Sequence, residues 1–143
     1  MKVLLATNVV VDVLQKRDPW FEDGKTIFLL SAGKQITGCI SAKSLTDIHY
    51  FSRRQFKGEE NTDERARQVI VKLLDLFEII DTLGIDCKNA VANKNNDYED
   101  AVMIESAARA GVDCIVTRNT DHFKTSPLPV YTPKEFLSFI SEC

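Results

Sequence analysis

Short apolar runs alternate with amphipathic stretches along the whole chain. The apolar runs cover residues 3–6, 35–40, 77–80, 114–117 and 129–131. Runs without regularly spaced polar positions are typical of strands that are covered on both faces of a sheet. The pattern therefore predicts five short, buried strands.

Helical periodicity fills the intervals between these strands. The expected helices cover residues 8–15, 21–32, 43–55, 87–93 and 97–110, with one whose N-cap is Thr62 or Asp63 and a last one from Pro133. Asn8, Ser41 and Asp97 are the expected N-caps of three of them, because such side chains accept hydrogen bonds from free N–H groups. Residues 118–124 form a polar loop that we expect to be partly helical. This alternation predicts an α/β fold with a mostly parallel sheet and helices on both faces.

Length and composition narrow the class of protein. The 143 residues predict a single domain, residues 1–143, and the 44% hydrophobic and 27% charged content is ordinary for a globular protein. No apolar run approaches the ~18 residues of a membrane helix, and Thr7, Asn8 and Asp12 interrupt the apolar start too early for a signal peptide. We therefore expect a cytoplasmic protein without a membrane partner.

Charge and missing motifs exclude further classes of function. A net charge of -3 argues against a non-specific nucleic-acid coat, which is usually basic. An enzyme that meets phosphates through a metal ion stays compatible with this charge. The four cysteines form no C-x-x-C pair, which argues against a zinc site, and no nucleotide-binding glycine loop or G-x-S-x-G elbow is present.

Candidate chemistry lies where the predicted strands end, since ligands of parallel sheets bind beyond the carboxyl ends of the strands. Asp47 comes about two helical turns after the second strand, and Asn119 and Asp121 follow the fourth. Asp97 and Asp100 begin the helix that enters the fourth strand. Oxygen ligands of this kind suit Mg²⁺ or Mn²⁺, which activate water and neutralise a phosphodiester.

The same acids also have ordinary structural explanations. A carboxylate at the position of Asp47 is equally compatible with a surface acid in a salt bridge. Asp97 and Glu99 suit the first turn of a helix, where acids cap free N–H groups and complement the helix dipole. Spacing alone leaves both interpretations open.

Five segments resemble, in order, the motifs of the PIN-domain family, in particular the VapC-like and PilT N-terminus-like bacterial ribonucleases. These segments are residues 3–12 (VLLATNVVVD), 41–48 (SAKSLTDI), 97–101 (DYEDA), 115–123 (IVTRNTDHF) and 130–137 (VYTPKEFL). The resemblance covers almost the whole chain. It implies a three-layer α/β/α sandwich with a central, mostly parallel sheet and a ribonuclease that depends on Mg²⁺ or Mn²⁺.

The resemblance also assigns roles to residues of this chain. It implies that Asp47 and Asp100 bind the metal, with Asn119 at a third catalytic position. Asp97 and Asp121 are implied as auxiliary metal ligands. Asn8 and Thr117 shape the cleft, and Arg118 meets either a substrate phosphate or a structural acid. Many relatives are toxins of type II toxin–antitoxin pairs, so an RNA substrate, an antitoxin partner and a homodimer are further expectations.

One position departs from the family pattern. The first acid of the family, at the end of the first strand, is Ala6 in this chain, and a methyl group cannot bind a cation. Ala6 is either an introduced change in an otherwise active nuclease, which we favour, or a natural feature of a catalytically inactive protein-binding module. A nuclease specific for DNA or for a nucleic-acid structure is a third alternative.

Overall fold

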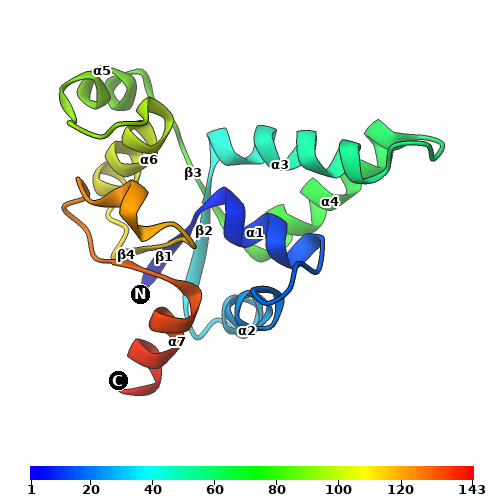
Figure 1. Ribbon diagram of the computed structural model, residues 1–143, viewed down its shortest axis with the longest axis horizontal. Coiled ribbons are helices and arrows are strands. Elements are labelled where there is room, and N and C mark those ends of the chain that lie inside the picture. The colour runs from blue at the N-terminus through cyan, green and yellow to red at the C-terminus, as the bar shows by residue number, and fades with distance from the viewer.

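The computed structural model describes all residues from 1 to 143 (Figure 1). Its strands are β1 (Lys2–Leu5), β2 (Thr37–Ser41), β3 (Glu78–Ile80), β4 (Cys114–Val116) and β5 (Val130–Tyr131). Its α-helices are α1 (Thr7–Leu14), α2 (Phe21–Ala32), α3 (Ala42–Gln55), α4 (Thr62–Leu76), α5 (Gly84–Ala92), α6 (Tyr98–Arg109) and α7 (Pro133–Ser141). A short 3-10 helix, η1, covers Thr120–Phe123. All five predicted strands are confirmed, with ends shifted by one or two residues.

The five strands form one parallel sheet in the order β3-β2-β1-β4-β5. Central β1 pairs with β2 on one side and with β4 on the other, where Val3 lies opposite Cys114. The chain builds outward from β1 to β2 and β3 and then crosses to β4. Such a reversal of strand order opens a crevice at the carboxyl ends of the strands, beside β1.

Helices cover both faces of the sheet. Val3 and Leu5 of β1 pack into a core cluster with residues of α1, α2, α3, α4 and α7. Leu4, between them, packs on the opposite face with Ile104 and Ala107 of α6. Figure 1 shows α5 and α6 on one side of the sheet and α1 to α4 on the other. The expected α/β/α sandwich is confirmed, and the sheet is entirely parallel.

Helix starts differ from the predictions at three places. Ala6, and not Asn8, holds the N-cap position of α1, because Asn8 turns its amide to the loop after β4. Asn61 precedes α4 in a left-handed conformation, with φ of 57° and no side-chain cap, so neither Thr62 nor Asp63 is the N-cap. α5 begins at Gly84, earlier than predicted, because Asp86 accepts a hydrogen bond from the backbone N–H of Leu83.

Other local predictions are confirmed. Ser41 caps α3, Asp97 caps α6, and Thr132 caps α7 in a capping box with Glu135. Gly111 ends the α6 region with φ of 73°, a conformation that favours glycine. No helix combines the length and the apolar character that a membrane span requires.

Candidate functional site

A cavity of about 800 Å³ opens at the carboxyl ends of the central strands. Ala6 directly follows β1, Ser41 ends β2 and Thr117 directly follows β4, and all three line the cavity. The buried strands β1 and β4 are hydrogen-bonded neighbours, so the residues after them emerge side by side. The cavity therefore lies at the crevice that the strand order creates.

Most of the residues that the sequence singled out share this cavity. The lining includes Ala6, Asn8, Asp47, Asp97, Asp100, Thr117, Arg118 and Asn119. Asp121 does not line it and lies instead beside Lys124, 3.5 Å away, with 85% of its side chain exposed. It shares η1 with Phe123, which is buried and anchors this turn. It borders a neighbouring pocket together with Asp97 and Asp100, so its expected role as an auxiliary ligand stays a prediction.

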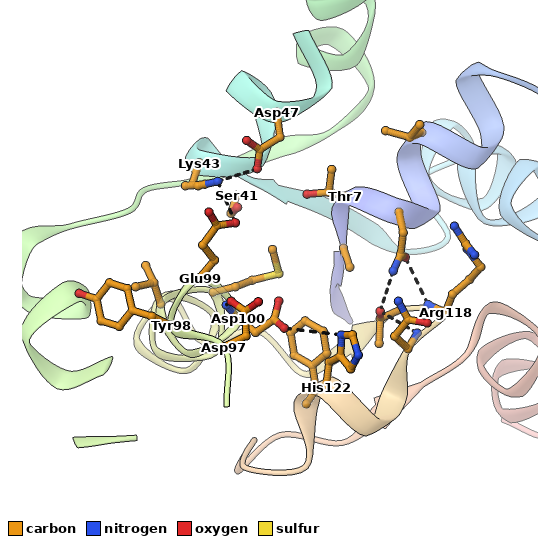
Figure 2. A pocket seen from close by; sticks show the side chains of 18 of the residues that line it. Thr7, Ser41, Lys43, Asp47, Asp97, Tyr98, Glu99, Asp100, Arg118 and His122 are labelled. Carbon is orange, nitrogen blue, oxygen red and sulfur yellow. Dashed lines mark hydrogen bonds and ion pairs between the residues drawn. The ribbon is translucent and has the colours of Figure 1, made fainter. Parts of the chain in front are cut away.

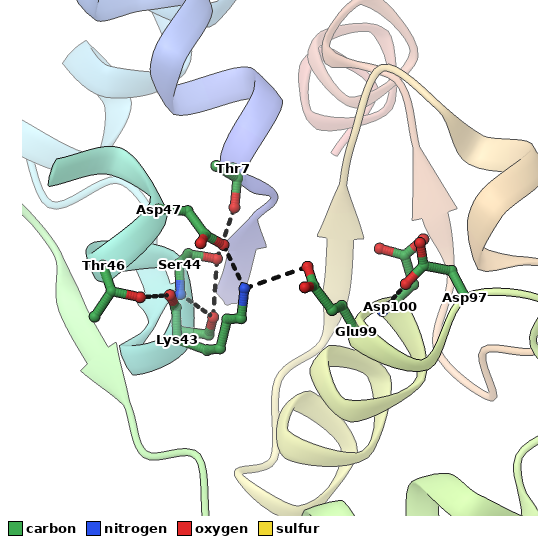
Figure 3. Close-up of polar contacts among 9 residues, drawn as sticks. Thr7, Lys43, Ser44, Thr46, Asp47, Asp97, Glu99 and Asp100 are labelled. Atoms are coloured by element: carbon green, nitrogen blue, oxygen red, sulfur yellow. Dashed lines mark hydrogen bonds and ion pairs between the residues drawn. The ribbon is translucent and has the colours of Figure 1, made fainter. Parts of the chain in front are cut away.

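Lys43 lies between acids from two elements. Its Nζ lies 2.7 Å from Asp47 Oδ2, one turn further along α3, and 3.2 Å from Glu99 Oε2 on α6 (Figure 3). Burial alone lowers the pKa of Lys43, but the hydrogen bonds and charges of both acids outweigh burial and raise it. The ammonium therefore stays charged and joins one wall of the cavity to the other.

The network around Ser41 fixes where α3 begins. Ser41 Oγ accepts a hydrogen bond from the backbone N–H of Ser44 at 3.1 Å, and the two hydroxyl oxygens are 2.9 Å apart. Thr7 donates from its hydroxyl to Ser44 Oγ at 2.9 Å. These contacts tie the starts of α1 and α3 together at the cavity. They thereby set the position of Lys43 and Asp47 relative to Ala6.

The first turn of α6 supplies the other acids. Asp97 accepts the backbone N–H of Asp100 as the N-cap, at 3.2 Å. Burial is the main cause that raises the pKa of Asp100, to about 6; Asp97 and Glu99 raise it further, and His122 opposes them. The Asp100 carboxylate lies 3.8 Å from His122 Nδ1 (Figure 2). A half-buried acid among like charges is typical of functional sites.

Amide and hydroxyl groups position the loop after β4. Asn8 donates from Nδ2 to Thr117 Oγ1 and accepts the backbone N–H of Arg118 at Oδ1, both at 3.2 Å. The same Thr117 hydroxyl accepts the backbone N–H of Asn119 at 3.2 Å. Asn8 and Thr117 therefore fix the backbone that carries Asn119, whose side chain is exposed at the cavity.

Arg118 makes a structural ion pair. Its Nε lies 2.7 Å from Oδ2 of buried Asp12, and its Nη2 donates to Asp12 Oδ1 at 3.3 Å. The guanidinium also covers the ring of Trp20, 3.9 Å from its centroid. Burial raises the pKa of Asp12, and Arg118 and Arg17 counteract this effect. The sequence left two roles open for Arg118, contact with a substrate phosphate or with a structural acid. In the structure Arg118 contacts the acid Asp12.

The donor set at the cavity can be compared with the needs of a divalent metal ion. Asp47, Glu99 and Asp100 present carboxylate oxygens, which are the ligands that Mg²⁺ and Mn²⁺ prefer. The donors therefore fit such an ion in kind. No three acids, histidines or cysteines lie close enough together to form a metal-binding cluster, and Ala6 adds a methyl group at the end of β1.

Sequence reasoning missed two residues of this arrangement, Lys43 and Asp12. Lys43 stands four residues before Asp47 in the first turn of α3, and this helical spacing was the available signal. Asp12 lies among the valines of α1, where a carboxylate on an apolar helix predicts a buried partner. The identity of that partner, 106 residues away, is not visible in the sequence.

Comparison with known proteins places the chain in a family. The PIN domain family profile matches residues 2–121, and no curated protein matches the sequence. The fold is similar to VapBC2 from Rickettsia felis bound to a promoter DNA fragment, with a TM-score of 0.64 and 21% identity over 91% of this chain and 97% of that one.

Two further solved structures share the fold at similar identity. A toxin-antitoxin complex from Klebsiella pneumoniae has a TM-score of 0.66 and 20% identity over 92% of this chain and 97% of that one. DNA-bound VapBC from Salmonella typhimurium has a TM-score of 0.66 and 20% identity over 93% and 98% of the two chains. The match of the family profile over most of the sequence, together with this fold, shows that the chain belongs to the PIN domain family.

Proposed function

We propose that the protein is a divalent-metal-dependent endoribonuclease that hydrolyses RNA phosphodiesters in the cytoplasm. The observation that carries this proposal is the sharing of one cavity by Asp47 of α3 and Asp100 of α6, at the strand-order reversal beside β1. Membership of the PIN domain family supports it. The donor chemistry of the cavity, described above, supports Mg²⁺ or Mn²⁺ as the cofactor.

Asp47 and Asp100 are the residues that would hold the ion. When bound, such an ion lowers the pKa of a water molecule and neutralises charge on the scissile phosphate. Asn119 lines the cavity, and its backbone N–H is held by the Thr117 hydroxyl, so its side-chain amide would be available to donate to a substrate phosphate oxygen. Asp97 already caps α6 through Oδ1, so we assign it to positioning Asp100.

Ala6 weakens this site in the present chain. It lines the cavity at the end of β1, and its methyl group supplies neither a ligand nor a negative charge. Loss of one carboxylate from a site that holds a divalent ion removes several kcal/mol of electrostatic stabilisation by our estimate, about 2–4 kcal/mol. We therefore expect weak cleavage by this chain and strong cleavage after Ala6→Asp.

RNA cleavage by the Ala6→Asp variant tests the proposal. The variant should cleave RNA in Mg²⁺ or Mn²⁺ and stop when EDTA is added. Asp47→Asn or Asp100→Asn in the same background should lower the cleavage rate at least a hundredfold, whereas the exposed-site control Asp75→Asn should not. A folded Ala6→Asp variant that cleaves no RNA at any metal concentration would count against the nuclease proposal.

Two alternatives to this proposal are separated by experiment, and the first has a specific observation behind it. Ala6 and the ion pairs of Lys43 favour a catalytically inactive protein-binding module. That module would bind a protein partner equally well before and after Ala6→Asp, without nucleolysis. The second alternative is a nuclease that prefers DNA. Cleavage of RNA and DNA of the same sequence by the Ala6→Asp variant distinguishes it from a ribonuclease.

Partners of the chain follow from the same proposal. The structures with a similar fold include toxin-antitoxin complexes. We propose by this likeness that the protein is the toxin of a type II pair, is held by an antitoxin protein and forms a homodimer. Light scattering of the purified chain measures its oligomeric state, and growth arrest on expression of the Ala6→Asp variant tests toxicity.

A further inference from the structure

We propose that the Lys43 ammonium is a built-in cation that occupies the space between the acids of the cavity and competes with a divalent metal ion for them. This inference rests on the proposed metal-dependent function. The inference adds that Lys43 determines how tightly the site binds the ion.

The geometry of Lys43 is that of a bridging cation. Its Nζ contacts one oxygen of Asp47 at 2.7 Å and one of Glu99 at 3.2 Å, so it binds carboxylates from α3 and α6 together. Figure 3 shows the ammonium between these two carboxylates, with Asp97 and Asp100 on the far side of Glu99. An ordinary salt bridge within α3 would involve Asp47 alone. The second contact spans the cavity and joins α3 to α6 through two residues, Lys43 and Glu99, that are 56 positions apart in the sequence.

The charge of the cavity leads to the same inference. Asp47, Asp97, Glu99 and Asp100 line it, and Lys43 neutralises the charge of one of them. Ala6 supplies no further carboxylate. A divalent ion that approached Asp47 would meet the positive charge of Lys43 at close range, since Nζ lies 2.7 Å from Asp47 Oδ2, and the two cations would repel each other. Metal binding therefore requires the Lys43 side chain to leave Asp47.

Direct measurement of Mn²⁺ binding tests this competition without any enzyme assay. The fraction of free Mn²⁺ is measured by electron paramagnetic resonance with the full chain, with Lys43→Gln and with Lys43→Arg. Lys72→Gln is the matched control, because Lys72 is exposed on α4 and does not line the cavity. We expect Lys43→Gln to bind Mn²⁺ about tenfold more tightly, and Lys43→Arg and Lys72→Gln to bind it like the parent. Equal affinity of Lys43→Gln and the parent would overturn the inference, as would an equal gain in Lys72→Gln.

A second measurement uses the unsubstituted chain, so it does not depend on a variant that folds. The rate of acylation of each lysine by an N-hydroxysuccinimide ester is followed by mass spectrometry with and without saturating Mn²⁺. Displacement from Asp47 and Glu99 should raise the rate at Lys43 several-fold and leave the rate at Lys72 unchanged. An unchanged rate at Lys43 would contradict the proposed competition.

The same variants separate this inference from the proposed function. If Ala6→Asp cleaves RNA while Lys43→Gln binds Mn²⁺ no better than the parent, the function stands and the role of Lys43 is wrong. If Lys43→Gln tightens Mn²⁺ binding while Ala6→Asp and a chain with both Ala6→Asp and Lys43→Gln cleave no RNA, the role of Lys43 stands and the nuclease proposal is wrong.

Discussion

Arg118 and Asp12 form an ion pair that links the loop after β4 to α1, with 2.7 Å between Nε and Oδ2. Asp12 is buried, and Arg118 keeps 23% of its side chain exposed. Arg118 lines the cavity, so the pair with Asp12 fixes the residue next to Asn119. The positive side chain of Arg118 at the edge of the cavity is thus engaged within the protein.

Arg118→Ala should destabilise the fold and loosen the cavity wall. Removing Arg118 leaves the buried Asp12 carboxylate with only the more distant Arg17, 3.9 Å away, and we expect a loss of about 2–3 kcal/mol in the free energy of unfolding. The fluorescence of Trp20, the only tryptophan, should shift to longer wavelength because Arg118 no longer covers its ring. Chemical denaturation and emission spectra measure both effects. An unchanged emission maximum would contradict the stacked arrangement.

Asn8→Ala should affect both stability and catalysis. Loss of the amide leaves the backbone N–H of Arg118 without its acceptor and frees the Thr117 hydroxyl. We expect a loss of about 1–2 kcal/mol in the free energy of unfolding. In the Ala6→Asp background, RNA cleavage should fall because Asn119 loses its fixed backbone. A normal cleavage rate in a destabilised Asn8→Ala variant would show that this network does not position Asn119.

Ser41→Ala should weaken the start of α3. The variant removes the acceptor of the Ser44 backbone N–H and a partner of the Ser44 hydroxyl. Loss of an N-cap costs about 1 kcal/mol, and the buried Ser44 hydroxyl adds to that cost. Thermal denaturation followed by circular dichroism measures the change. Thr132→Ala, which removes the cap of α7 far from the cavity, compares the same loss at another helix.

Asp86 should give the fold a component of stability that depends on pH. This buried carboxylate accepts hydrogen bonds from the Leu83 backbone N–H, the Ser106 hydroxyl and the Arg109 guanidinium. Burial alone raises the pKa of Asp86, but the hydrogen bonds from Arg109, Leu83 and Ser106 outweigh burial and hold the pKa below its usual value. A carboxyl with a lowered pKa stabilises the fold above the unfolded-state pKa of about 3.9, and this contribution is lost as the pH falls toward the folded-state pKa.

Asp86→Asn should therefore cost about 2–4 kcal/mol at neutral pH and reduce the loss of stability between about pH 5 and pH 3. Urea denaturation at several pH values measures this difference. Asp75→Asn, on the exposed face of α4, is the control and should leave the pH dependence close to that of the parent. If Asp86→Asn and the parent lose stability in parallel below pH 5, Asp86 does not carry this component.

The order of elements was predictable from local pattern, because each strand is an apolar run and each stop signal acts within a few residues. Ser41, Asp97 and Gly111 did what their chemistry predicts at helix ends. Asn8 did not, since its Oδ1, the atom that would accept a helix N–H in a cap, instead accepts the backbone N–H of Arg118, 110 residues away. Contacts at such a distance depend on the strand order, which local pattern does not specify.

The sequence predicted which residues come together at the cavity better than it predicted which charged side chains form pairs there. Asp47, Asp100 and Asn119 share one cavity because parallel strands bring their carboxyl ends to the same edge. The bridging role of Lys43 was not predictable, because its contact with Glu99 arises only when α3 and α6 face each other. Asp121, which the family resemblance assigned as an auxiliary ligand, is exposed beside Lys124 and borders a neighbouring pocket with Asp97 and Asp100, a placement that depends on the η1 turn.

A Mn²⁺ soak of crystals of the Ala6→Asp variant tests the central claim most directly, because the anomalous signal of Mn²⁺ locates the ion. We predict one or two anomalous peaks in the cavity, in contact with carboxylate oxygens of Asp47 and Asp100 and with the introduced carboxylate. A soaked crystal in which the cavity has no anomalous peak, or in which Mn²⁺ binds only outside it, would contradict the account.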